Sequence, residues 1–411
     1  MKPLHLFLLA ALPLAAHASP WQFSDPVDLT ETELPPHFHH LDGAGRSQLA
    51  VAGSFLALTW EDDRDGDPQV YVAIKAIEAA EFHRQERLST GAEAYEPTIV
   101  SLGENHWFAA WEQDGAIVGR EIKDALGPLI PISGENGIQG GQVTLAANGS
   151  DELVALWIRL EQGSRTLTAT RLDLGATPGS VDTQIVAPVP GKAFQGYPAA
   201  TFAGDGNLVV GFEDRRKGHT RLYVTWRAPD GGFSEALQIN EHREPDPALG
   251  LSGGKGTGVM RITLSAGEGR LIRAAWLDKR SPGSGYAVWG SLSEDGGRSF
   301  MANEIVQDEF GASTAQWHAS VLHGADGFVC IWDDAREAWD EDDEEAGDVF
   351  VSWRRENGWS EDFAIPGASG EGYQGSPVGD IDNMGNLHVA WIERENLQSP
   401  SRLRYILGRR Q

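Results

Sequence analysis

The stretch Trp60-Glu61-Asp62-Asp63-Arg64 is one of seven full or degraded copies of a Trp-x-Asp-x-Arg motif in this chain. The aromatic residue that opens each copy lies at Trp60, Trp111, Trp157, Phe212, Trp276, Trp332 and Trp391. Successive copies are separated by 46 residues at the closest (111 to 157) and 64 at the widest (212 to 276). Propeller blades of four strands repeat at about 40 to 50 residues, so these intervals fit blades with long loops. The repeat predicts an all-β chain folded as a seven-bladed β-propeller.

Apolar or alternating residues lie on both sides of the motif. Phe55–Thr59 precedes the first copy and Val70–Ile74 follows it, and both segments are typical of β-strands. Each repeat therefore predicts four strands, of which the second ends in the motif. A six-bladed propeller would require the weak copy at Trp157 to be discarded.

The two ends of the chain complement each other. Trp21–Leu29 resembles the predicted fourth strand Trp359–Ile365, whereas the last repeat, Tyr373–Leu407, has room for only three strands. Joining the ends would complete the seventh blade and remove a free sheet edge. We therefore expect an N-terminal strand to close the propeller.

The first residues of the chain are typical of a secretory signal. Lys2 supplies a positive start, Leu6–Ala16 an apolar core and Ala16–Ala18 a small-residue cleavage site. Removal of residues 1–18 would leave a single propeller domain over residues 19–411, in the periplasm or outside the cell. No later run approaches the roughly 18 apolar residues of a membrane span. The one cysteine, Cys330, lies in a strand-like apolar run and is predicted to be a buried packing residue.

Acidic residues outnumber basic ones by 60 to 33, which gives a formal net charge of −27. Such a charge repels nucleic acid and anionic membranes, and no basic patch in the sequence reverses it. It also disfavours strongly polyanionic glycans, although a few arginines inside a funnel could still hold one. We expect a monomer that binds no nucleic acid.

One turn carries a more specific pattern. Ser293–Phe300 fits Ser-x-Asp-x-Gly-x-Ser-aromatic, and partial copies lie at Asp230–Phe233 and Glu356–Trp359. This pattern is similar to the Asp-box, the bacterial neuraminidase repeat, so the chain resembles the sialidase-like superfamily of propellers. The resemblance implies a protein that binds a glycan in a central funnel and cleaves it as a glycoside hydrolase would. The chain departs from true sialidases, which have six blades and an Arg-Ile-Pro motif near the start.

Arginine recurs at one place in the motif. We assign this place to Arg64, Arg215, Arg280 and Arg336. A residue that repeats from blade to blade usually solves a packing problem that also repeats, so a structural role beside a neighbouring Asp is favoured over catalysis.

Propeller ligands usually bind at the mouth of the central funnel, which is lined by the loops leading into each first strand. Those segments hold different polar and aromatic residues in each repeat, which favours a binding site over a shared packing role. The predicted catalytic residues are Glu96, Tyr197, Arg261 and His318. The predicted substrate-binding residues are His39, Tyr95, Gln195, Trp317, Tyr373 and Gln374. Tyr95 and Glu96 are adjacent, so only one of them is expected to face the funnel.

Other functions fit the same residues. His318 or Tyr197 as a base, with Arg261 beside a uronic carboxylate, would suit a polysaccharide lyase. A non-catalytic scaffold that binds a protein or an envelope component is a further alternative. None of these functions requires a cofactor. The acidic segment that contains Asp340, Asp342 and Asp343 has oxygen ligands of the kind that hold Ca²⁺.

Overall fold

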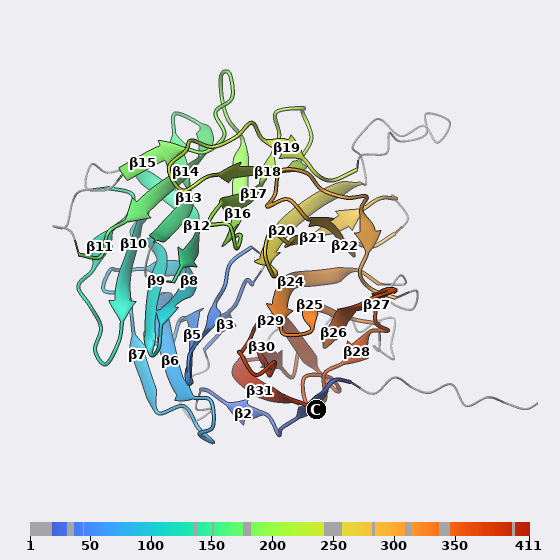
Figure 1. Cartoon of the computed structure of the whole chain (residues 1–411). Coiled ribbons are helices and arrows are strands. Elements are labelled where there is room, and N and C mark those ends of the chain that lie inside the picture. The colour runs from blue at the N-terminus through green and yellow to red at the C-terminus, as the bar shows by residue number, and fades with distance from the viewer. Residues whose placement is uncertain are drawn as a thin grey trace, which may run out of the picture.

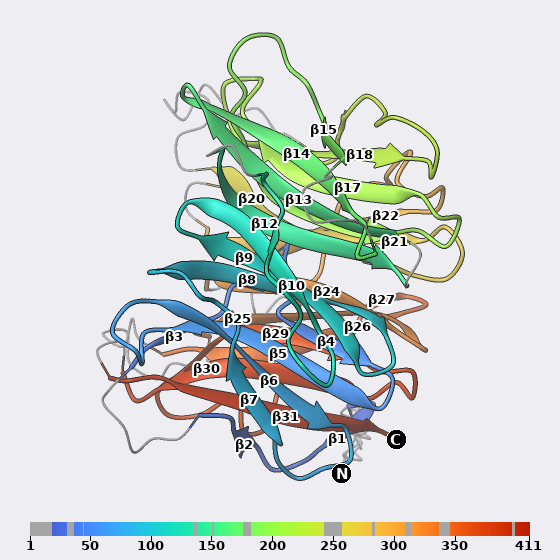
Figure 2. The same cartoon turned by 90° about the vertical axis from the view of Figure 1, so that its left-hand side faces the viewer.

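The computed structural model describes residues 19–30, 37–43, 45–134, 138–149, 152–175, 182–241, 257–281, 284–308, 314–336, 346–396 and 399–411. Within these ranges the strands form seven sheets arranged around a central axis (Figure 1). Figure 2 views the ring from its edge, where neighbouring sheets pack face to face. The predicted all-β, seven-bladed propeller is confirmed. No helix of the described residues is long and apolar enough to cross a membrane.

Blades 1 to 3 follow the order of the chain. Blade 1 contains β3 (His39–His40), β4 (Leu49–Ala52), β5 (Phe55–Asp62), β6 (Gln69–Ala76) and β7 (Arg84–Arg87). Blade 2 contains β8 (Ala94–Gly103), β9 (His106–Gln113), β10 (Ala116–Ile122) and β11 (Ile130–Pro131). Blade 3 contains β12 (Gln139–Asn148), β13 (Glu152–Glu161), β14 (Ser164–Leu172) and β15 (Asp182–Ile185).

Blades 4 to 6 continue this antiparallel pattern. Blade 4 contains β16 (Gln195–Phe202), β17 (Leu208–Asp214), β18 (Arg221–Arg227) and β19 (Leu237–Gln238). Blade 5 contains β20 (Gly258–Ala266), β21 (Ile272–Lys279), β22 (Ala287–Ser293) and β23 (Glu304–Ile305). Blade 6 contains β24 (Gln316–Gly324), β25 (Gly327–Asp334), β26 (Asp348–Arg355), β27 (Gly358–Trp359) and β28 (Phe363–Ala364).

Both ends of the chain build blade 7. It contains β29 (Tyr373–Ile381), β30 (Leu387–Arg394), β31 (Arg402–Arg410), β1 (Trp21–Phe23) and β2 (Val27–Asp28). β1 and β2 pair antiparallel with β31, and Trp21 lies opposite Arg410. The Trp21 indole N–H also donates to the Gly385 carbonyl at 2.9 Å. Closure by an N-terminal strand is therefore confirmed.

The aromatic residues of the motif form the core between neighbouring blades. All seven, at Trp60, Trp111, Trp157, Phe212, Trp276, Trp332 and Trp391, are at most 1% exposed. At roughly 25 cal/mol per Å², burial of a ring of this size stabilises the fold by about 4–6 kcal/mol. Cys330 is fully buried in the cluster shared by blades 5 and 6, as predicted, and burial raises the pKa of its thiol.

The Asp of the motif joins the buried indole to the arginine. In blade 6, Asp334 accepts hydrogen bonds from Trp332 Nε1 (3.0 Å) and from Arg336 Nε (2.9 Å). The Asp334 carboxylate has no exposed surface, so the arginine supplies the charge that water cannot. Asp62 and Asp278 make the same two contacts in blades 1 and 5. The expected structural role of the motif arginine is confirmed.

In blade 4 one assignment was wrong by one residue. The arginine that pairs with Asp214 is Arg216, at 2.6 Å, and not Arg215. In all four complete copies the arginine lies four residues after the aromatic, which places its side chain back over the end of the strand. Arg215 Nε instead donates to Thr220 Oγ1 at 3.1 Å, outside the motif.

Asp295 holds the turn that follows β22. Its Oδ1 accepts hydrogen bonds from the backbone N–H groups of Arg298 (3.0 Å) and Ser299 (2.9 Å). Gly296 and Gly297 have φ values of 76° and 84°, in the left-handed region that glycine adopts without a steric cost. The acid and the two glycines therefore act together to reverse the chain at the rim of blade 5.

A segment of blade 1 crosses the central channel. This axial segment, residues 41–43 and 45–48, joins β3 to β4. Its Gly45 carbonyl accepts a hydrogen bond from Thr144 Oγ1 (2.9 Å) on blade 3, and its Gly43 carbonyl accepts one from Ser320 Oγ (3.0 Å) on blade 6. Those blades lie on opposite sides of the ring, so the axial segment spans the channel (Figure 1). A Cβ at residue 45 would lie 2.8 Å from the Ile262 carbonyl oxygen, and only glycine fits there.

Candidate active site

A β-bulge interrupts the innermost strand of blades 2 to 7 at the same place. The bulge residues are Glu96, Gln142, Tyr197, Arg261, His318 and Ser376, on β8, β12, β16, β20, β24 and β29. Each has a φ between 47° and 58°. Nine non-glycine residues of the described chain have a positive φ, and the other three lie in hairpin turns. This conformation costs an L-residue about 1–2 kcal/mol, and such strain is concentrated at functional sites.

Side chains of the preceding blade hold five of the six bulges by the backbone N–H group of the bulge residue. The acceptor and bulge pairs are Glu61 with Glu96 (3.1 Å), Glu112 with Gln142 (2.5 Å), Gln142 with Tyr197 (2.9 Å), Glu213 with Arg261 (2.9 Å) and Asp333 with Ser376 (3.2 Å). The four acids directly follow the motif aromatic. Successive residues of a strand point to opposite sides, so each acid faces the following blade while the aromatic faces the preceding one. They were not predicted as site residues, although this alternation was a usable signal.

Arg46 of the axial segment lies among three carboxyl groups. Its Nη2 is 2.6 Å from Glu96 Oε2, and its side chain is almost fully buried. Asp42 and Glu112 lie within its electrostatic range. Burial, together with the neighbouring Glu96, raises the pKa of Glu112 to about 7. Glu112 therefore keeps a proton up to near-neutral pH, as a general acid must.

Arg261 joins the axial segment to blade 4. Its Nη1 lies 3.1 Å from Asp42 Oδ2, and its guanidinium carbon lies 3.9 Å from the centroid of the Tyr197 ring. Burial opposes ionisation of Asp42, but Arg46 and Arg261 lower its pKa. Arg46 thus lies within electrostatic range of an ionised carboxylate, that of Asp42, and of a carboxyl group, that of Glu112, that retains its proton.

His318 forms a dyad with Asp333. His318 Nδ1 lies 2.7 Å from Asp333 Oδ1, and about a third of the His318 side chain is exposed. Burial alone would lower the pKa of His318, whereas Asp333, by charge and hydrogen bond, and Asp42 raise it. The dyad therefore holds a histidine whose pKa lies above its ordinary value of 6.5.

The four predicted catalytic residues therefore occupy one equivalent position in four blades. Glu96 and Arg261 contact the axial segment directly, Tyr197 stacks on Arg261, and His318 interacts electrostatically with Asp42. Their catalytic role stays a prediction, but their proximity is a property of the fold.

The predicted substrate-binding residues divide into two groups. Trp317 is 40% exposed and packs against the Tyr286 ring, with the centroids 5.4 Å apart. Tyr95 and Tyr373 are partly exposed, and Tyr95 donates to Glu93 at 2.7 Å. Tyr95 and its neighbour Glu96 therefore have different partners, as strand geometry led us to expect.

His39, Gln195 and Gln374 are buried, so the prediction that they contact a substrate is corrected. His39 is 1% exposed and contacts Ser401 Oγ through its backbone N–H (2.6 Å) and Nδ1 (2.8 Å). Gln195 Nε2 donates to Asp214 at 3.0 Å, and Gln374 is only 4% exposed. Each lies at the start of a blade, and the side-chain amides of Gln195 and Gln374 donate to carbonyl or carboxylate oxygens of the chain.

Asp340, Asp342 and Asp343, the predicted Ca²⁺ ligands, lie outside the described residues. Among the residues that the structure describes, His37, His39 and Asp62 bring their ligand atoms within 4.8 Å of one another. Both oxygens of Asp62 already accept hydrogen bonds from Arg64. A metal ion there would have to displace or face that guanidinium, so we assign no metal to this cluster.

No family model matches the chain, and no curated protein matches it. A protein of unknown function from Dyadobacter fermentans has a TM-score of 0.56 and 9% identity, over 96% of this chain and 100% of that one. A Penicillium chrysogenum α-L-arabinanase complexed with arabinobiose has a TM-score of 0.50 and 11% identity, over 76% of this chain and 92% of that one. A Trypanosoma rangeli sialidase has a TM-score of 0.49 and 10% identity, over 95% of this chain and 59% of that one. At such identities the likeness concerns the β-propeller fold alone.

Proposed function

We propose that the chain is an exported glycoside hydrolase that binds a neutral glycan in the central funnel. The observation that carries this proposal is the ring of strained bulges. Six blades hold an L-residue at positive φ in the same place, yet the side chains there are all different. A shared packing need would select similar residues, whereas a binding site needs different ones.

The charge of the funnel favours a neutral glycan over an anionic one. The carboxyl groups around the bulges and the axial segment are those of Asp42, Glu61, Glu96, Glu112, Glu213 and Asp333. The arginines within electrostatic range of these groups include Arg46, Arg261, Arg165 and Arg215, and the first two already contact a carboxylate. A uronate or a sialic acid would enter a site with excess negative charge, which weakens the lyase and sialidase alternatives.

Glu112 and Asp42 suit the two proton transfers of glycoside hydrolysis. Glu112 would give its proton to the glycosidic oxygen as the bond to the anomeric carbon breaks, with the bonding electrons leaving on that oxygen. A water molecule would add to the anomeric carbon and give its proton to the ionised Asp42. Two carboxyl groups with pKa values driven apart by their surroundings are the usual equipment for this reaction.

A substrate panel tests the proposal. Purified residues 19–411 would be incubated with neutral oligosaccharides, arabinobiose among them, with sialosides and with uronate polymers, and new reducing ends would be measured. We expect turnover of a neutral glycan and a loss of about 100-fold or more in kcat for Glu112→Gln. Glu235→Gln, an exposed acid at the outer edge of blade 4, is the matched control and should retain full activity.

Two outcomes would overturn the proposal. Turnover that survives Glu112→Gln would assign the acid elsewhere, and binding without turnover on every substrate would support a non-catalytic scaffold. Export is a separate part of the proposal. Protein recovered from the cell envelope or the medium should begin at Ser19 when its N-terminus is sequenced.

A further inference from the structure

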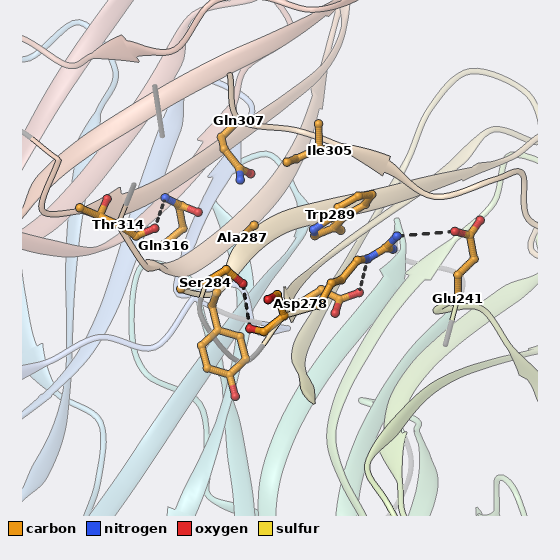
Figure 3. Close-up of a pocket in the computed structure, with 13 residues that line it drawn as sticks. Glu241, Asp278, Ser284, Ala287, Trp289, Ile305, Gln307, Thr314 and Gln316 are labelled. Carbon is orange, nitrogen blue, oxygen red and sulfur yellow. Dashed lines mark hydrogen bonds and ion pairs between the residues drawn. The ribbon is translucent and has the colours of Figure 1, made fainter. Parts of the chain in front are cut away.

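A cavity of about 670 Å³ is lined mainly by blade 5, with Thr314 and Gln316 from the segment that leads into blade 6 (Figure 3). Its blade 5 lining comes from the end of β21, from β22 and its preceding segment, and from β23 and its following segment. Trp289, Gln307 and Asp278 are three of the residues that line it. The volume falls in the range of sites for small organic ligands.

Trp289 is the cross-strand neighbour of a motif aromatic, and its side chain is partly exposed. It lies opposite the buried Trp276 in the pairing of β21 with β22. The residues at this place in blades 1, 4 and 6 are Tyr71, Tyr223 and Phe350, and each is at most 5% exposed. Trp289 is only partly buried, because it lines the cavity while the guanidinium of Arg280 lies 3.3 Å from its ring centroid. Blade 5 therefore presents an indole where other blades bury their aromatic ring.

Gln307 is longer than its counterparts and leaves a donor in the cavity. Its Oε1 accepts the backbone N–H of Val288 at 2.9 Å. The counterparts in blades 1, 2 and 4 are Ser89, Ser133 and Asn240, which accept the equivalent N–H groups. Gln307 is 2% exposed, and its Nε2 has no acceptor among the described residues. Figure 3 shows its amide end directed toward the space between Gln316 and Trp289.

A buried donor without an acceptor destabilises the protein unless a ligand or water supplies one. A sugar ring meets the chemistry of this cavity. Its C–H groups would pack against the part of the Trp289 indole that Arg280 leaves exposed, one hydroxyl would accept from Gln307 Nε2, and another would donate to Asp278. The ion pair of Asp278 with Arg280 (3.1 Å) holds that carboxylate in place.

The cavity borders the funnel through two aromatic rings. Tyr286 lines the cavity, and its ring packs against Trp317, the residue before His318. Tyr286 also lies within electrostatic range of both Asp278 in the cavity and Glu213 in the funnel. A chain of sugars can therefore extend from the funnel, past Trp317 and Tyr286, to Trp289.

We propose that this cavity is an outer subsite of the glycan site, so that the substrate is an oligosaccharide or polysaccharide rather than a single sugar. The inference rests on the proposed function. It adds that the substrate chain leaves the funnel between blades 5 and 6.

Calorimetric titration of the full mature chain tests it. The Glu112→Gln protein, which is expected to bind without turnover, would be titrated with the disaccharide and the hexasaccharide of the arabino-, xylo- and cello-series. We expect the hexasaccharide of one series to bind at least about 10-fold more tightly than its disaccharide. Gln307→Ser places a hydroxyl where Ser89 and Ser133 accept the equivalent backbone N–H groups in blades 1 and 2. This variant should bind the hexasaccharide about 3- to 10-fold more weakly and the disaccharide with unchanged affinity.

Trp289→Ala should weaken the hexasaccharide in the same way, and Gln307→Ser stands as the test if Trp289→Ala fails to fold. Equal affinity for both lengths, or no effect of Gln307→Ser on the hexasaccharide, would overturn the outer subsite alone. No binding of either length in any series would instead overturn the proposed function.

Discussion

The strain at the bulges can be measured by replacing Tyr197 with alanine and with glycine. Both variants remove the ring that stacks on Arg261, so the lost contact cancels in the comparison. Both keep the backbone N–H that donates to Gln142 Oε1. The two variants differ mainly in how well each residue tolerates a φ of 48°.

The two contributions have opposite signs. The left-handed region costs alanine about 1–2 kcal/mol, and glycine's freedom in the unfolded chain costs about 0.4–1 kcal/mol. Tyr197→Gly should therefore be more stable than Tyr197→Ala by about 0.5–1 kcal/mol. At Gln184, an exposed residue of the edge strand β15, the alanine variant should instead be more stable than the glycine variant by about 0.5–1 kcal/mol. The stability difference between glycine and alanine should therefore change by about 1–2 kcal/mol from one site to the other.

Urea titration is the better assay for this difference. For a chain of this length, unfolding entropy of about 0.8 kcal/mol per degree would turn 1 kcal/mol into a Tm shift of only about 1 °C. Shifts in the urea midpoint at constant slope report the stability directly. If Tyr197→Ala proved as stable as Tyr197→Gly, the bulge would carry no strain and the reasoning would be refuted.

Three further predictions concern stability. Arg336→Ala should lower the free energy of unfolding by about 3–5 kcal/mol in urea titration, because it leaves the buried carboxylate of Asp334 without its cation. Arg280→Ala should cost less, because the Arg280 side chain is 28% exposed. Equal losses for the two variants would contradict this reasoning. Trp21→Ala should cost about 3–5 kcal/mol, and a neutral result would mean that β1 does not close the ring. The pKa of Glu112 is about 7 in the folded protein against an ordinary 4.5, so folding favours its protonated form. The free energy of unfolding should therefore fall as the pH rises from about 4.5 to about 7. Glu112→Gln should make this fall smaller, and a pH profile that the substitution leaves unchanged would refute the raised pKa.

Part of the predicted residue set lies at one equivalent place in the fold for a definable reason. Tyr197, Arg261 and His318 were singled out because equivalent slots held unlike residues, and that signal is present in a single sequence. Gln195 was assigned to the same funnel from its place next to Tyr197, yet it is buried at the start of its blade. Glu112 was not predicted as a site residue, although it follows the core aromatic Trp111 on β9 and its side chain must point the other way.

The sequence by itself determined the blade count, the closure by Trp21 and the joining of aromatic, Asp and Arg within each motif. These features arise from residues that are close in the chain or repeat along it, so a local pattern carries them. The positive φ of the bulges, the axial segment across the channel and the partial exposure of Trp289 were decided only by the tertiary structure. Each depends on contacts between blades far apart in sequence: a bulge is held by an acid of the preceding blade, and Gly45 by a hydroxyl on blade 3. No local pattern encodes such a partner, because only closure of the ring brings the two together.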